Sequence, residues 1–286
     1  MRTPRVGFLG NCQAQSLESL SGHLGLDVEV VGLPPVWILG SAQRAEVEEK
    51  LSGCDYIFKQ RVDKNFSVEY VQDQYVRQRY AAKVVLWPNM YFDGYFPGIQ
   101  NLYRPQGKVE GPLADYHFDW ILEAWKSKLS VEAAAQYALD PWPANAVSDS
   151  VERSIALLRQ RERGLDVIIS DYVRDRFRVR KLFYSMNHPT TELLAEMLQR
   201  LLAFAGLPHG GRWKGYAYPL DLVDIPCFAS FHRIYRPLFA PSMEIKGCAV
   251  SLETNKALTE SAKIFDWPGL IAEYYALYER VGLERP

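Results

Sequence analysis

A glycine, two amide side chains and a thiol follow directly on the first apolar run of the chain. The run VGFL, residues 6–9, leads at once into Gly10, Asn11, Cys12 and Gln13. This order predicts a strand that ends at a glycine and turns immediately into a helix. Backbone N–H groups at such a helix start hold anions or a developing oxyanion, and the helix dipole favours a thiolate. We therefore expect Cys12 to be a reactive thiol, the alternative being a small residue that permits close strand-to-helix packing.

Two later segments carry side chains suited to acyl transfer. WPNMYFDGYFP, residues 87–97, follows the fourth expected strand, so Asn89 should lie at the same sheet edge as Cys12 and could donate to an oxyanion. SMNHPTT, residues 185–191, puts His188 at a helix start, where an imidazole suits a general base. Each has a structural alternative: a turn cap for Asn89, core packing for its aromatic neighbours, and capping or packing for His188.

Basic residues gather in two places that suit phosphate groups. Lys59 and Arg61 follow the third expected strand, at the ligand edge of the sheet. A second group lies at residues 174–181 and comprises Arg174, Arg176, Arg178, Arg180 and Lys181. Arginine forks match phosphate geometry, whereas a run of charges is more often a solvated face.

The other three cysteines, Cys54, Cys227 and Cys248, stand in apolar or mixed runs without a CxxC pair. A disulfide framework and a zinc site therefore have little support, and no metal is expected. Free cysteine is among the most buried residue types, so these three are predicted to be core thiols.

The elements expected to position these residues form an α/β unit. Strands are predicted at residues 6–9, 28–31, 56–58 and 83–86, with helices at 14–24 and 42–51 and a third opened by Ser67, which indicates parallel strands joined by βαβ connections. Residues 89–112 are interpreted as a long aromatic loop. Further helices are predicted at 114–128, 130–139, 148–163, 190–205 and 269–281. We expect an α/β subdomain at 1–112 and a mainly helical part at 113–286, packed as one domain.

The composition of the chain favours a globular protein and argues against a nucleic-acid-binding or membrane-spanning one. The chain has 286 residues, 48% hydrophobic and 23% charged, which is typical of a globular fold. Its formal net charge of -1 removes the usual electrostatic reason to bind nucleic acid. The first apolar run is far too short for a signal peptide or a membrane span, so we expect a cytoplasmic protein without an integral membrane segment.

In their order and separation, the GNCQ turn, the PNMYFDGYFP segment and the NHPT turn resemble the WcbI-like family of capsular polysaccharide biosynthesis proteins. The resemblance implies a coenzyme A-binding, acetyltransferase-like protein whose Rossmann-like parallel-sheet subdomain is embedded in a larger, mostly helical cradle. It implies catalytic roles for Cys12, Asn89 and His188, and acetyl-coenzyme A as cosubstrate. The coenzyme contacts that we expect with it come from Gly10, Asn11, Gln13, Lys59, Arg61, Tyr91, Arg178, Arg180 and Asn187.

The same residues also resemble a distant variant of the SGNH hydrolase pattern, with Cys12 in place of the serine. Ser185 stands where that pattern has its orienting aspartate, so the triad is incomplete. Asn187, a backbone carbonyl or another carboxylate would then have to orient His188.

Three functions remain open. The favoured hypothesis is transfer of an acetyl group from acetyl-coenzyme A to a sugar or polysaccharide precursor, with His188 as base. In it, Cys12 either carries the acetyl group covalently or lines the thioester pocket. The alternatives are hydrolysis of an ester and a non-catalytic component that binds coenzyme A or a nucleotide sugar in association with capsule biosynthesis proteins.

Overall fold

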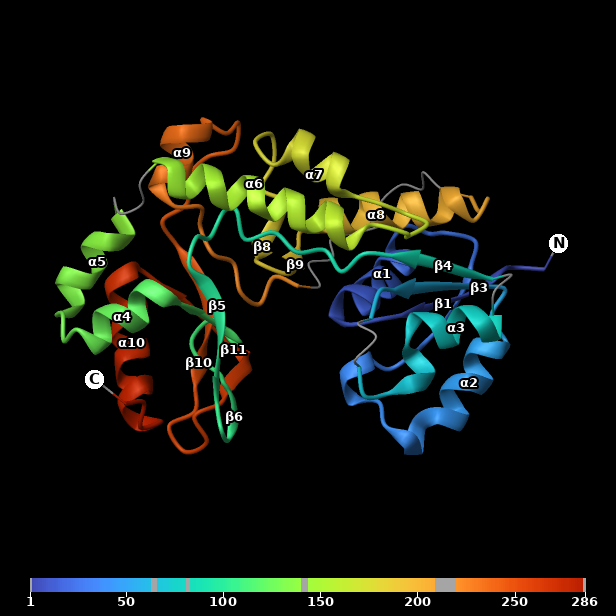
Figure 1. Cartoon of the computed structure of the whole chain (residues 1–286), viewed down its shortest axis with the longest axis horizontal. Coiled ribbons are helices and arrows are strands. Elements are labelled where there is room, and N and C mark those ends of the chain that lie inside the picture. The colour runs from blue at the N-terminus through green and yellow to red at the C-terminus, as the bar shows by residue number, and fades with distance from the viewer. Residues whose placement is uncertain (1, 63–65, 81–82, 140–143, 209–219, 285–286) are drawn as a thin grey trace. The chain divides into compact units, whose positions relative to one another are not determined.

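The computed structural model describes residues 2–62, 66–80, 83–139, 144–208 and 220–284. The chain divides into two compact units, each built from three separate stretches (Figure 1). Unit 1 comprises Met1–Tyr91, Ile155–Asp175 and His188–Leu220, and unit 2 comprises Phe92–Ser154, Arg176–Asn187 and Asp221–Pro286. The boundary after residue 112, and the packing of both parts as one domain, stay predictions.

Unit 1 contains a four-stranded parallel sheet, and the predicted α/β class is confirmed. Its strands are β1 (Arg5–Leu9), β2 (Glu29–Val31), β3 (Tyr56–Gln60) and β4 (Val84–Trp87), in the spatial order β2-β1-β3-β4. The chain runs outward from β1 to β2 and then crosses back to β3. Ligands of such sheets bind beyond the carboxyl ends of the strands where the order reverses, which here lies between β1 and β3.

Helices complete unit 1 and bury the sheet. They are α1 (Cys12–His23), α2 (Arg44–Ser52), α3 (Asp73–Tyr80) and α8 (Thr191–Phe204), with 3-10 turns η1 (Val36–Ile38), η2 (Ser41–Gln43) and η3 (Glu69–Val71). Leu9 and Ile57 share one core cluster with Val47, Leu51 and Val76 of α2 and α3. The helix expected to open at Ser67 begins as the short turn η3 and becomes α-helical only at Asp73.

The outer edge of β4 is covered by a segment from much later in the chain. The carboxylate of Asp166 accepts a hydrogen bond of 2.7 Å from the N–H of Leu86 and pairs with Arg77. The Leu86 carbonyl in turn accepts from the N–H groups of Asp166 and Val167, both at 3.1 Å. These bonds use the backbone groups that an edge strand otherwise leaves unpaired.

Unit 2 combines helices with antiparallel strands. Its three-stranded sheet has the order β6-β5-β7, and β10 pairs with β11. The strands are β5 (Ile99–Arg104), β6 (Gly107–Val109), β7 (Tyr116–Phe118), β8 (Phe183–Ser185), β10 (Ile245–Val250) and β11 (Ala257–Phe265). The helices are α4 (Asp119–Lys126), α5 (Val131–Leu139), α9 (Ala229–Tyr235) and α10 (Trp267–Arg280), and two more, α6 (Ala144–Arg161) and α7 (Ser170–Arg176), belong in part to each unit.

Two expectations about this region are wrong. The supposed loop at 89–112 contains the hairpin of β5 and β6, and residues 116–118, expected to be helical, form β7. The sequence of β5, IQNLYR, lacks the alternation of apolar and polar residues that would reveal a strand, and only Ile99 in it is buried. Gly107 supports the tight hairpin because it adopts φ +120° directly after the turn.

The aromatic residues at 92–96 fill the core of unit 2. Phe92, Tyr95 and Phe96 have no exposed surface. The ring of Phe92 meets that of Tyr95 edge-on at 4.8 Å, and the Tyr95 hydroxyl donates to the Phe177 carbonyl at 2.8 Å. For these three residues the structural alternative, core packing, is confirmed.

Among the described residues, no helix combines the length and the apolarity that crossing a membrane requires.

Candidate functional site

The predicted strand-turn-helix is present, and the turn belongs to the carboxyl edge of the sheet. β1 ends at Leu9, Asn11 caps α1, and Cys12 is the first helical residue. The Asn11 side chain accepts a hydrogen bond of 2.9 Å from the N–H of Gln13, as is usual for asparagine at this position. Cys12 is half-buried.

Two buried glutamines fix the turn against the ends of two other strands. The Gln60 side-chain oxygen accepts from the N–H of Asn11, and its amide nitrogen donates to the side-chain oxygen of Gln13, both at 2.9 Å. Gln13 also bonds both backbone groups of Met90, accepting from the N–H at 3.0 Å and donating to the carbonyl at 2.7 Å. The turn after β1, the end of β3 and the segment after β4 are therefore held together.

Gly10 is required by this close approach. A Cβ atom at Gly10 would lie 2.6 Å from the Cβ of Gln60 and 2.9 Å from the Cβ of Ala14. Neither of these neighbours is the free end of a flexible chain, so any larger residue would push apart β3 and α1. The contribution of Gly10 visible here is close packing, and the coenzyme contacts expected of Gly10, Asn11 and Gln13 stay predictions.

Asn89 lies beside this network, as the sequence predicted for a residue following the fourth strand. The backbone of its neighbour Met90 is bonded on both sides by Gln13. The Asn89 Oδ1 atom is buried and accepts no hydrogen bond within the described part of the chain. The carbonyl oxygen of this side chain is therefore not used by the fold.

A further apolar turn, missed by the sequence reasoning, is attached to the same loop. The N–H of Val36, the first residue of η1, donates to the Gly10 carbonyl at 2.9 Å. The next two residues, Trp37 and Ile38, each leave 57% of their surface exposed. No local pattern relates residue 36 to residue 10, so this attachment could not be found from the sequence.

His188 lies in unit 1 with Cys12. It begins the two-residue strand β9 (His188–Pro189), is half-buried, and precedes Thr190, which caps α8. Helix α8 contacts α1, whose first residue is Cys12. Cys12 is thus the first residue of α1, and His188 lies two residues before the cap of the helix that contacts α1.

Asn187 and Ser185 belong to unit 2. The Asn187 side-chain oxygen accepts a hydrogen bond from the Tyr116 hydroxyl, and Ser185 is fully buried. The expectations that Asn187 contacts a coenzyme or orients His188 stay predictions.

Lys59 lies at the predicted edge but is completely buried. Its ammonium group is 3.1 Å from Asp73 Oδ1 and also donates to the Gln60 carbonyl. Burial lowers the pKa of Lys59 to about 8, although the Asp73 carboxylate favours the charged form. Lys59 therefore forms an ion pair within the fold, with the carboxylate of Asp73.

Arg61, two residues further on, is anchored by the backbone of another segment. Its Nη1 donates to the carbonyl oxygens of Arg161 at 2.8 Å and of Arg163 at 3.0 Å. Its Nε lies 3.5 Å from Asp73 Oδ2. Arg61 thus joins the end of β3 to the end of α6.

Tyr91 contacts a cation that the sequence reasoning missed. The guanidinium carbon of Arg161 lies 4.6 Å from the centre of the Tyr91 ring. Arg161 is the last residue of α6, seventy positions later in the chain. Basic residues are common in the last turn of a helix, so its type and position gave no signal of a site.

Arg178 and Arg180 are exposed residues of unit 2. The Nε of Arg178 donates to the Tyr235 carbonyl at 3.0 Å. The phosphate contacts expected from these residues stay predictions.

The remaining cysteines are core residues, as predicted. Cys54, Cys227 and Cys248 are 1%, 7% and 0% exposed. Burial raises the pKa of Cys54 to about 11 and that of Cys227 to about 12, and it also raises the pKa of Cys248.

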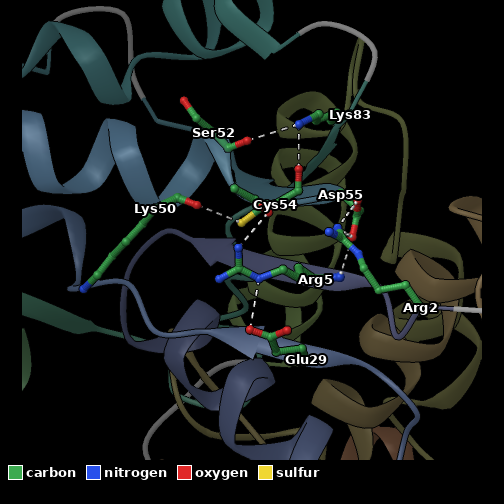
Figure 2. Close-up of polar contacts among 9 residues, drawn as sticks. Arg2, Arg5, Glu29, Lys50, Ser52, Cys54, Asp55 and Lys83 are labelled. Carbon is green, nitrogen blue, oxygen red and sulfur yellow. Dashed lines mark hydrogen bonds and ion pairs between the residues drawn. The ribbon is translucent and has the colours of Figure 1, made fainter.

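Figure 2 shows Cys54 before the amino end of β3, where its thiol donates to the Lys50 carbonyl at 3.3 Å. Arg5, Asp55 and Lys83 form polar contacts around it, including a bond of 2.8 Å from the Arg5 N–H to the Asp55 carboxylate. Cys54 therefore lies at the opposite end of the strands from Cys12. Within the described ranges, no cluster of three or more His, Cys, Asp or Glu residues could hold a metal ion.

Comparison with known proteins gives one family and one fold. Residues 6–210 match the family described as "Polysaccharide biosynthesis enzyme WcbI". A solved structure of WcbI, a polysaccharide biosynthesis enzyme, is similar with a TM-score of 0.77 and 20% identity, over 98% of this chain and 91% of that one. It is described as the native protein without a disulfide bond between COA and one of its cysteines. No curated protein sequence matches the chain.

Proposed function

Because the chain belongs to the WcbI family of polysaccharide biosynthesis enzymes, we propose that it is an acetyl-coenzyme A-dependent O-acetyltransferase acting on a sugar in capsular or exopolysaccharide biosynthesis. The site of this chain and the description of the similar structure support this choice of substrates. In this chain the turn after β1 supplies the thiol of Cys12. Other segments of the same unit supply the amide of Asn89 and the imidazole of His188.

The observation that carries the proposal is the position of Cys12. The description of the similar structure implies that a cysteine of that protein can lie close enough to coenzyme A to form a disulfide. In this chain three of the four cysteines are buried, and Cys12 alone is half-exposed at the ligand edge of the sheet. A coenzyme whose thiol reaches Cys12 would bring the thioester carbonyl of acetyl-coenzyme A to the same point.

The reaction then needs one base and one oxyanion donor. His188 takes the proton of the acceptor hydroxyl, and the oxygen attacks the thioester carbonyl. The Asn89 amide donates to the carbonyl oxygen as negative charge develops there. The C–S bond breaks, and the leaving coenzyme A thiolate takes the proton back from the imidazolium.

Cys12 has two roles open to it in this scheme. As a nucleophile it forms an acetyl-cysteine first and releases coenzyme A before the sugar reacts, which gives ping-pong kinetics. As a neighbour of the thioester it only shapes the pocket, and transfer occurs in a ternary complex. The buried Gln13 and Gln60 amides favour a rigid position for the residue in both cases.

Ligand-induced stabilisation is the first test. Melting temperature is measured with coenzyme A, acetyl-coenzyme A, nucleotide sugars and dinucleotides in turn. A ligand at about 100 times its dissociation constant adds roughly 2.7 kcal/mol to the free energy of unfolding. We expect a rise with the two coenzymes alone, and the absence of a shift at millimolar coenzyme A would contradict the proposal.

Substitution then separates catalysis from binding. Cys12→Ser and His188→Gln are compared with wild type and with His23→Gln, which alters a histidine at the far end of α1. We expect His188→Gln to abolish transfer of acetyl to sugar acceptors while coenzyme A still binds. Intact-mass spectrometry after mixing with acetyl-coenzyme A detects an acetyl group on Cys12 if the route is covalent. Unchanged acetylation in both variants would instead indicate a non-catalytic binding component.

A further inference from the structure

We infer that Arg161 binds a phosphate group of the coenzyme and that Tyr91 holds its guanidinium group in position for this. The inference rests on the proposed function, because it concerns the coenzyme that the proposal names. It adds a residue that neither the motifs nor the family match singles out.

The position of the Tyr91 ring comes from the network around the turn. Tyr91 directly follows Met90, whose backbone is bonded to Gln13, and it is the second residue after Asn89. The ring therefore lies on the segment that leaves the carboxyl end of β4. An arginine stacked on this ring is placed at the same edge of the sheet.

Arg161 reaches this edge because its backbone is anchored there. The carbonyl oxygens of Arg161 and Arg163 both accept hydrogen bonds from Arg61, just past the end of β3. The guanidinium carbon then lies 4.6 Å from the centre of the Tyr91 ring, a distance typical of a cation–π contact. Backbone and side chain are thus fixed independently, by Arg61 and by Tyr91.

The guanidinium group has unused hydrogen-bonding capacity. Its Nη1 atom is buried and donates to no acceptor within the described residues, although the side chain as a whole is partly exposed. A buried donor left unsatisfied is costly, and arginine offers five N–H donors in a planar fork. An anion with several oxygen atoms in one group, such as a phosphate, is the ligand that fits this fork.

The two cations that the sequence places at this sheet edge, Lys59 and Arg61, already have partners within the fold. Lys59 is fully buried and forms an ion pair with Asp73. The Nη1 of Arg61 donates to two carbonyl oxygens, and its Nε lies beside the Asp73 carboxylate. No carboxylate of the described chain lies within ion-pair distance of Arg161. Of these three cations, only Arg161 has a charge that is not paired with a carboxylate of the described chain, so its charge remains for an anionic ligand. The structural alternative is a guanidinium group that does no more than cover Tyr91.

Calorimetric titration of the full-length protein tests the assignment. Arg161→Met keeps the apolar stem over Tyr91 and removes the charge, and Arg161→Gln is a second variant in case the first fails to fold. The matched control is Arg159→Met, an exposed arginine in the last turn of the same helix. Each protein is titrated with coenzyme A, 3′-dephospho-coenzyme A and pantetheine, which lacks phosphates.

We expect the Arg161 variants to bind coenzyme A roughly ten- to a hundredfold more weakly, the effect of losing one charge-assisted hydrogen-bonding group. Affinity for pantetheine should not change, and Arg159→Met should behave as wild type. A loss that persists with 3′-dephospho-coenzyme A assigns Arg161 to the pyrophosphate, and one that disappears assigns it to the 3′-phosphate.

Folded Arg161 variants that bind coenzyme A as tightly as wild type would overturn the inference and leave the proposed function standing. If the wild-type protein itself binds no coenzyme A, the proposed function fails first.

Discussion

The side-chain oxygen of Gln60 accepts a hydrogen bond of 2.9 Å from the backbone N–H of Asn11. The last residue of β3 thereby fixes the residue that caps α1, and it does so from a buried side chain. The thiol of Cys12 follows this capped residue directly, so its position depends on a glutamine nearly fifty residues away in sequence.

Replacing Gln60 by leucine should loosen the turn while keeping the volume of the side chain. The N–H of Asn11 and part of the Gln13 amide would lose their partners inside the fold. Each unsatisfied buried group costs about 1–3 kcal/mol. We expect a lower free energy of unfolding in urea titrations and weaker binding of coenzyme A. Gln160→Leu, at an exposed position, is the control and should change neither quantity.

Gly10→Ala and Gly22→Ala form a matched pair with opposite expected signs. At Gly10 the new methyl group would meet Gln60 and Ala14 at less than 3 Å, whereas at Gly22, inside α1, it meets nothing within 4 Å. Overpacking costs typically 1–3 kcal/mol, and alanine in a helix interior gains about 1 kcal/mol over glycine. Thermal unfolding measures both, and equal effects at the two sites would contradict the packing described here.

Iodoacetamide should label Cys12 first among the cysteines. Burial raises the pKa of Cys54, Cys227 and Cys248 and also shields their thiols, whereas Cys12 is half-exposed. Since the thiolate is the nucleophile, the buried three should react only when the protein unfolds. Peptide mass spectrometry follows the four sites over time, with and without acetyl-coenzyme A. Protection of Cys12 by the coenzyme is expected, and equal rates with and without it would remove Cys12 from the coenzyme site.

His117 should make unit 2 sensitive to acid. This fully buried ring contacts the Val109 carbonyl through Nε2 at 3.0 Å and the Tyr278 hydroxyl through Nδ1 at 3.1 Å. Because a carbonyl can only accept, Nε2 carries the proton of the neutral ring and Nδ1 accepts from Tyr278. Burial lowers the pKa of His117 from 6.5 to about 4, with Val109 and Asp115 opposing the shift.

The unfolded chain therefore binds the proton more readily between pH 6.5 and pH 4. The stability associated with neutral His117 is complete above pH 6.5 and is lost as the pH falls through this window, by on the order of 3 kcal/mol. Urea unfolding at pH 7 and pH 4.5 measures the loss. His117→Gln should show a smaller difference between the two pH values, whereas His23→Gln should keep the wild-type difference.

The turn from β1 to α1 could be predicted from the sequence because all of its residues are neighbours in the chain. The strand, the glycine, the capping asparagine and the helix at Cys12 occupy consecutive positions, so short-range preferences suffice to describe them. Asn89 could be placed at the same edge because parallel strands share the direction of their carboxyl ends.

The rest of the site depends on contacts between residues that are far apart in sequence, and no local pattern predicts such contacts. The sequence predicts that Gln13 contacts a ligand, and it gives no sign that the side-chain amide also bonds the backbone of Met90, seventy-seven residues further on. In sequence Arg161 is an ordinary basic residue at the end of a helix, and only its contact with Tyr91 distinguishes it. The strand β5 escaped detection because its residues are mostly half-exposed and its partner strand β7 lies beyond the hairpin.

The segment at Asp166 and Val167, which bonds the outer edge of β4, affects the tendency of the chain to aggregate during its synthesis. Asp166 and Val167 can occupy the outer backbone groups of Leu86 only after the chain has been made as far as that segment. Until then β4 offers an open strand edge to other nascent chains, a known route to aggregation. Truncation before residue 166 should therefore yield a polypeptide that contains the residues of all four parallel strands, leaves the edge of β4 open and needs a chaperone to remain in solution.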